Sequence, residues 1–199
     1  MARKPLMPVA KSAKLCIIRM ILENFFLEMI GIDLFSGAGG MSLGAALAGV
    51  EVKVAVESDR FAGETFAKNH PNVELINRRI ETIRPKEIKS WKLFGSPMIV
   101  FGGPPCQGFS WSNVRTRNTE NESNWLFHEF IRVVKILAPE WVVFENVRGI
   151  TDTAGGIFAK TIVNYLEKIN YSVTMALLNA KDFGVPQNRE RIVIVASKK

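Results

Sequence analysis

Short apolar runs alternate with amphipathic stretches along most of this chain, and this alternation predicts strands that alternate with helices. Buried strands are expected at residues 29–35, 52–56, 73–76, 97–101, 141–144, 171–178 and 192–196. Helices are expected at residues 8–28, 41–48, 61–69, 125–137 and 157–169. Because connections of this kind join parallel strands, the pattern predicts an α/β fold with a doubly wound, mostly parallel sheet.

The size and composition indicate one ordinary globular unit. The chain has 199 residues, of which 47% are hydrophobic and 23% are charged, and its formal net charge is +7. We expect an N-terminal amphipathic helix within residues 1–28 and a single catalytic domain over residues 29–199. A positive charge suits a polyanionic partner, although by itself it favours nucleic acid only modestly.

Cysteine and histidine are too sparse for a metal site. Cys16 and Cys106 form no CxxC pair, and the chain has only two histidines, His70 and His128. We therefore expect no metal. No signal peptide or membrane-spanning run is evident, and a reducing, cytoplasmic setting is expected.

A glycine-rich turn follows the first predicted strand. Ser36 to Gly40 reads SGAGG and leads into a helix, as at the start of a nucleotide-binding βαβ unit. Glu57 ends the next strand, where such folds bind ribose hydroxyls, and it argues against a 2′-phosphorylated ligand. The alternatives are a plain structural turn and a solvated loop carboxylate.

The stretch from Phe101 to Trp111, FGGPPCQGFSW, places Cys106 in a rigid turn after a buried strand. Two prolines fix the approach of the chain, and Gly102 and Gly103 let another molecule come close to the backbone. This is how a nucleophile is presented, whereas the alternative is a buried apolar cysteine.

Glu145 follows the predicted strand 141–144 and should lie at the same sheet edge as Cys106, so that thiol and carboxyl converge on one pocket. The alternative is a helix-capping or solvent-facing glutamate. Arg189 and Arg191 share one face of an extended segment, and they either point at this site or pair with acids.

Four blocks together resemble the ordered signature motifs of DNA (cytosine-5) methyltransferases. They are DLFSGAGG (Asp33 to Gly40), FGGPPCQGFS (Phe101 to Ser110), ENV (Glu145 to Val147) and DFGVPQNRERI (Asp182 to Ile192). The resemblance implies the Rossmann-like fold of S-adenosylmethionine-dependent methyltransferases.

The resemblance also implies the roles of individual residues. It implies that Cys106 is the nucleophile, that Glu145 faces the cytosine ring nitrogen, and that Arg189 and Arg191 flank the target base. It implies an S-adenosylmethionine site that comprises Phe35, Ser36, Gly37, Gly40, Glu57, Ile80, Gly102 and Pro104. The target cytosine has to be flipped out of duplex DNA, and residues 111–124 are the candidate loop to close over it.

The chain departs from the family pattern in three places. Residues 77–80 read NRRI where the family usually has an acid that contacts the adenine amino group. The family's target-recognition region normally follows the last strand, so we expect a second polypeptide that carries this region and docks near Lys199. Pro5 to Ile18 bears a faint likeness to the family's final helix, which would make the chain a circularly permuted member.

Two other functions stay open at this point. One is an RNA methyltransferase of the related transfer-RNA type, although a serine after the phenylalanine in PPCQGFS favours DNA. The other is an inactive regulatory module, against which the intact Cys106, Glu145 and Arg189 argue.

Overall fold

The computed structural model describes residues 29–92, 96–105, 126–152 and 156–199. The expected helix at 8–28, Cys106 and the candidate closing loop lie outside these ranges. The described strands form one seven-stranded sheet in the order β3-β2-β1-β4-β5-β7-β6. The strands are β1 (Met29–Leu34), β2 (Val50–Glu57), β3 (Glu74–Asn77), β4 (Met98–Gly102), β5 (Trp141–Val147), β6 (Tyr171–Asn179) and β7 (Glu190–Lys198). The predicted α/β fold is confirmed.

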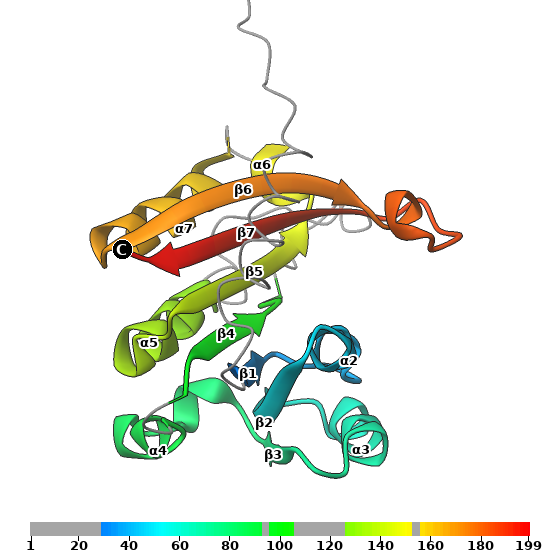
Figure 1. Cartoon of the computed structure of the whole chain (residues 1–199), viewed down its shortest axis with the longest axis vertical. Helices are drawn as coiled ribbons and strands as arrows, with labels where there is room; N and C mark the ends of the chain where they lie inside the picture. The colour runs from blue at the N-terminus through cyan, green and yellow to red at the C-terminus, as the bar shows by residue number, and fades with distance from the viewer. Residues whose placement is uncertain (1–28, 93–95, 106–125, 153–155) are drawn as a thin grey trace, which may run out of the picture.

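Helices cover both faces of the sheet. Figure 1 shows α4, α5 and α7 on one face and α2 and α3 on the other. The helices are α2 (Gly40–Leu47), α3 (Arg60–Asn69), α4 (Pro85–Ser90), α5 (Phe127–Leu137), α6 (Gly149–Asp152) and α7 (Ile157–Lys168), with 3-10 turns η1 (Ile80–Thr82) and η6 (Ala180–Phe183). This is the doubly wound arrangement that the alternating pattern predicts.

The strands from β3 to β5 are parallel, whereas β7 runs antiparallel to both of its neighbours, β5 and β6. The amino end of β7 therefore lies beside the carboxyl end of β5, and Arg191 is opposite Val147. At the other end of β7, the Lys199 amide donates to the Asn170 carbonyl. Lys199 thus lies at the sheet edge away from the carboxyl ends of the parallel strands.

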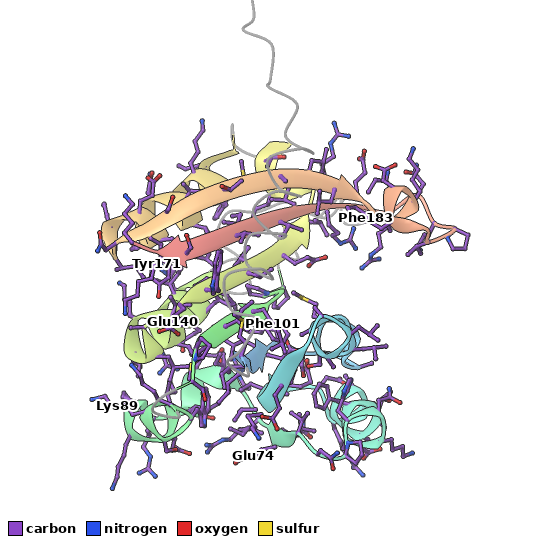
Figure 2. All side chains as sticks on the ribbon, viewed as in Figure 1. Glu74, Lys89, Phe101, Glu140, Tyr171 and Phe183 are labelled. Carbon is purple, nitrogen blue, oxygen red and sulfur yellow. The ribbon has the colours of Figure 1, made fainter. Side chains whose placement is uncertain are left out.

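The larger hydrophobic core lies under α5 and α7. There Phe130 of α5 packs edge-on against Phe144 of β5, with ring centroids 5.3 Å apart. A smaller core on the opposite face contains Met29, Ile99 and Phe101 and is covered in part by α2. Figure 2 shows Phe183 at the far end of the β6–β7 hairpin, beyond the helices.

Residues 78–89 differ from the solvated basic loop that their charges suggest. They contain η1 and most of α4, and they bury Ile80, Ile83 and Ile88 in the larger core. The basic residues of this segment predict an exposed loop, but the three isoleucines recur at a spacing that anchors two short turns in the core. The basic residues remain on the surface, where Arg78 pairs with Glu87.

Candidate active site

The carboxyl ends of the parallel strands gather the candidate residues at one edge of the sheet. Leu34 at the end of β1 is in register with Gly102 at the end of β4, which is in turn in register with Phe144 of β5. This is the edge at which open α/β sheets bind ligands.

The glycine turn after β1 has three residues with positive φ angles, a conformation that glycine adopts without strain at two of them. Gly37 and Gly39 have φ of +55° and +96°, and the non-glycine Phe35 has φ of +60°. A Cβ atom at Gly39 would lie 2.3 Å from the Nε2 atom of His70, whereas one at Gly37 would meet nothing within 4 Å. Gly39 is therefore needed for packing, and Gly37 leaves room for a ligand.

Glu57 ties the tip of β2 to this turn. Its two carboxylate oxygens accept hydrogen bonds from the Gly37 amide at 2.8 Å and from the Asp59 amide at 2.7 Å. The carboxylate thus fixes the turn and the loop that begins α3 in one arrangement.

Asp33 is a buried carboxyl beneath the same turn. Its Oδ2 atom accepts a hydrogen bond of 2.6 Å from the Ser42 hydroxyl of α2. Its Oδ1 atom and the Ser36 hydroxyl are buried and have no hydrogen-bond partner within the part of the chain that the structure describes. Burial raises the pKa of Asp33 to about 7, and the charge of Glu57 acts in the same direction, against the hydrogen bonds with Ser42.

A pocket of about 490 Å³ opens beside the turn. Its walls come from the ends of β1 and β2, from residues 78–81, and from the turn that follows β4. The lining residues are Phe35, Val56, Glu57, Ser58, Arg78, Arg79, Ile80, Glu81, Gly103, Pro105 and Leu126. A pocket of this size at this edge suits a small organic ligand.

Glu145 and Arg191 form an ion pair between β5 and β7. The Arg191 Nε atom lies 2.8 Å from Oε1 of Glu145, and both side chains are about one quarter exposed. The pair is diagonal across the antiparallel strands, since Glu145 is opposite Val193 and Val147 is opposite Arg191. The other carboxylate oxygen, Oε2, would lie 2.9 Å from a Cβ atom placed on Gly103.

The turn that leads to Cys106 is fastened to the end of β5. The Asn146 side-chain amide donates to the Pro104 carbonyl at 3.0 Å, and Asn146 is buried. Gly103 has the Glu145 carboxylate on one side and also lines the pocket. The pocket and the ion pair therefore meet at one residue.

The family described as C-5 cytosine-specific DNA methylase matches residues 29–199, which are all the residues of the predicted catalytic domain. The chain belongs to this family. It is 39% identical over 170 residues to the Type II methyltransferase M.DdeI of Desulfomicrobium norvegicum, in an alignment that covers 84% of this chain and 40% of the relative. The predicted membership of the cytosine-5 methylase family is thus confirmed.

Solved structures agree with this membership. A prophage-encoded protein of E. coli that is described as a DNA modification methyltransferase superposes with a TM-score of 0.73 at 34% identity, over 86% of this chain and 47% of that one. The chain therefore spans about half the length of most of the methylases it matches. A shorter relative is M.AquIA of Picosynechococcus, which is 38% identical and of which the alignment covers 71%.

The predicted cofactor residues of this chain fall into two groups. Phe35, Glu57 and Ile80 line the pocket, and the glycine turn lies beside it, with Gly40 exposed at the start of α2. Gly102 and Pro104 are buried, and the pocket wall from this turn consists of Gly103 and Pro105 instead. A Cβ atom at Gly102 would lie 2.0 Å from the Leu34 carbonyl oxygen, so glycine is required there for strand packing.

The predicted catalytic residues are brought together only in part. Glu145 and Arg191 meet, whereas Arg189 is exposed on the hairpin, where its amide donates to the Asn179 side chain at 3.1 Å. Cys106 lies outside the described residues. Arg189 and Arg191 therefore have different partners, although they lie two residues apart on one extended segment.

Several residues of the site carry signals that the sequence reasoning did not use. Asp33 is the single charge within the apolar run of β1, and Asn146 follows Glu145 at a strand end. Within the residues that the structure describes, no cluster of side chains could hold a metal ion, and no helix is long and apolar enough to cross a membrane.

Proposed function

We propose that this protein methylates carbon 5 of cytosine in DNA, with S-adenosylmethionine as the methyl donor. The observation that carries the proposal is the position of Gly103. It lines the pocket, it lies beside the Glu145 carboxylate, and it precedes Cys106 by three residues in the sequence. A cofactor in the pocket and a base at Glu145 would therefore be neighbours.

The residues of the pocket fit S-adenosylmethionine. Ribose hydroxyls and an ammonium group are hydrogen-bond donors, and Glu57 supplies a carboxylate at the pocket wall. Beneath the turn beside the pocket, Asp33 Oδ1 and the Ser36 hydroxyl are buried and have no hydrogen-bond partner among the described residues, and Gly37 leaves the turn open. Bound there, the cofactor would supply an electrophilic methyl group.

Cys106 is proposed as the nucleophile because carbon 5 of cytosine is too weakly nucleophilic to react unaided. Addition of the thiolate to carbon 6 forms a carbon–sulfur bond and moves the electron pair of the ring double bond to carbon 5, which then takes the methyl group. Loss of the carbon 5 proton and expulsion of the thiolate restore the double bond.

Glu145 and Arg191 are proposed to assist this addition from the base side. Arg191 holds Oε1 of Glu145, which leaves Oε2 on the side of Gly103 and of the turn that presents Cys106. A hydrogen bond donated by the acid form of this carboxyl group to ring nitrogen 3 would draw electron density from the ring and favour attack at carbon 6. The Arg191 guanidinium would stabilise negative charge that develops on the base.

We also propose that sequence-specific recognition is provided by a second polypeptide. Docking near Lys199 is unfavourable, because Lys199 lies at the sheet edge away from the site. The β6–β7 hairpin is better placed, and it exposes Leu177, Phe183 and Val185.

A methyl-transfer assay tests the proposal. The 199-residue chain is incubated with labelled S-adenosylmethionine and with duplex DNA or RNA of mixed sequence, with and without the polypeptide encoded beside it. We expect methylation of DNA cytosines only when both polypeptides are present, and bisulfite sequencing locates the target. Efficient methylation of RNA would contradict the DNA assignment, and methylation of a defined DNA site by the chain alone would contradict the need for a partner.

A further inference from the structure

Two side chains at the end of α3 hold the carbonyl side of the glycine turn. The Nε2 atom of His70 lies 3.0 Å from the Gly39 carbonyl oxygen, and the Asn69 side-chain amide donates to the Ala38 carbonyl at 3.4 Å. Each of the two residues is 31 positions further along the chain than its partner. The contacts therefore join the turn before α2 to the end of α3, and Figure 1 shows both helices on the same face of the sheet.

The sequence of the turn supplies no cap for the amino end of α2. The N-cap residue is Gly39, which has no side chain, and the first turn of the helix contains no acidic residue. The Gly39 carbonyl instead accepts two hydrogen bonds, one from the Leu43 amide at 2.9 Å and one from the His70 ring. A turn rich in glycine loses much backbone freedom when it is ordered, so a contact from outside the turn has a large effect on its conformation.

The imidazole of His70 is the donor in this contact. A carbonyl oxygen only accepts hydrogen bonds, so the Nε2 atom carries a hydrogen. The ring packs against Phe66, one helical turn earlier, with ring centroids 4.6 Å apart, and the His70 amide donates to the Phe66 carbonyl at 2.8 Å. Phe66 is itself buried. The donor is therefore held by packing on one side and by the carbonyl on the other.

The space beside Gly39 is matched to this ring. A Cβ atom on Gly39 would lie 2.3 Å from the Nε2 atom of His70 and 3.0 Å from the Phe66 ring. Gly39 is also buried and has φ of +96°, a conformation that other residues rarely adopt. Glycine at position 39 thus admits the ring, and the ring donates to the glycine carbonyl.

The pocket side of the turn is held in a different way. There the Glu57 carboxylate accepts a hydrogen bond from the Gly37 amide at 2.8 Å. The residues that line the pocket include Glu57 and Phe35 but not His70. A change at His70 would therefore reach a ligand in the pocket only through the turn.

We propose that His70, assisted by Asn69, is a positioning residue for S-adenosylmethionine, which holds the glycine turn in its binding conformation without touching the ligand. A turn that is already ordered loses less conformational freedom when the ligand binds, so more of the contact energy appears as affinity. The inference rests on the proposed use of this pocket for S-adenosylmethionine. It goes beyond that proposal because it assigns part of the affinity to a side chain outside the pocket.

Calorimetry with S-adenosylhomocysteine on the full 199-residue chain compares two variants at one position. His70→Phe keeps a ring beside Phe66 and removes the donor. It should weaken the affinity by about three- to tenfold, since a single hydrogen bond contributes this much. His70→Gln removes the ring but places an amide nitrogen within reach of the same carbonyl, so its affinity should stay within about twofold of the wild type.

Asn69→Ala should weaken the affinity by about twofold or less, because its hydrogen bond is long and exposed. The matched control is Lys68→Ala, an exposed residue in the last turn of the same helix, which should leave the affinity unchanged. Nitrogen-15 NMR of the wild-type His70 ring should show a hydrogen on Nε2. Thermal melts establish that each variant is folded.

The outcomes separate this proposal from the one on which it rests. If His70→Phe binds as tightly as the wild type, or if His70→Gln loses as much affinity as His70→Phe, the role of His70 is wrong while the cofactor assignment stands. A wild-type ring without a hydrogen on Nε2 would overturn the role as well. If the folded wild-type chain does not bind S-adenosylhomocysteine, the proposed cofactor pocket is wrong, and the role of His70 is overturned with it.

Discussion

The two halves of the candidate site are built in different ways. The cofactor half, at the ends of β1 and β2, is held by one carboxylate and by backbone conformation: Glu57 accepts two backbone amides, and Gly37 and Gly39 set the turn with positive φ angles. The base half, at the ends of β5 and β7, is held by one ion pair between Glu145 and Arg191.

This difference has a consequence for what each half can tolerate. The glycine conformations persist when a neighbouring side chain changes, whereas the two amide contacts depend on Glu57 and the partly exposed ion pair depends on both of its partners. Changes in the base half should therefore affect the transfer step, and changes in the cofactor half should affect binding.

The largest expected effect is that of Cys106→Ser. A hydroxyl is a far weaker nucleophile than a thiolate, so methyl transfer should fall by roughly 10⁴-fold or more while the affinity for S-adenosylmethionine is retained. Single-turnover kinetics and calorimetry measure the two quantities. Transfer at the wild-type rate by the serine variant would show that Cys106 is not the nucleophile.

Glu145→Gln should reduce the transfer rate by about 10²–10⁴-fold, because the amide cannot give a proton to the base and loses the ion pair with Arg191. Cofactor affinity should change little. The matched control is Glu190→Gln, which removes the neighbouring ion pair between Glu190 of β7 and Arg148, the residue after β5. A large loss of cofactor affinity in Glu145→Gln would show that the base half of the site also contributes to cofactor binding.

Glu57→Ala should weaken cofactor binding by about 10- to 100-fold, through loss of charge-assisted hydrogen bonds to the ribose. At saturating cofactor the transfer rate should be largely retained. Glu51→Ala, on the same strand but exposed and paired with Lys53, should leave the affinity unchanged. Equal affinities of the Glu57 and Glu51 variants would rule out this role for Glu57.

The last expected effect is on stability and not on methyl transfer, and it concerns the dependence of stability on pH. Burial raises the pKa of Asp33 from 3.8 to about 7, so the folded state binds a proton more tightly than the unfolded chain does. The contribution of Asp33 to the free energy of unfolding is fully present below about pH 4 and is lost as the pH rises to about 7. Asp33→Asn should remove this decline, which denaturant unfolding at pH 4, 5.5 and 7 measures. Parallel pH profiles of the two proteins would contradict the raised pKa.

Much of the fold follows from the sequence because its strands are short apolar runs bounded by turn residues. The expected strand at 29–35 and helix at 157–169 agree with β1 and α7 to within a residue or so. The glycine turn and Glu57 could be placed as well, since their spacing is set by a local βαβ unit.

The rest depends on contacts between distant segments. Nothing local to Arg191 shows that β7 inserts antiparallel beside β5, and this insertion is what brings Arg191 and not Arg189 to Glu145. In the same way, the isoleucines of residues 78–89 are buried because they pack with α5 in the larger core, which is distant in the sequence. The many basic residues around the η1 turn predict an exposed loop, so the sequence alone does not indicate this turn.

The reversed direction of β7 also determines where the molecule can be altered with least harm. A fluorescent reporter joined after Lys199 would start beside Asn170, across the sheet from the pocket, and should leave the chemistry undisturbed. A peptide inserted between Phe183 and Asn188 would instead emerge within a few residues of Arg191. The first position is suited to observing the protein at work, and the second to changing what it acts on.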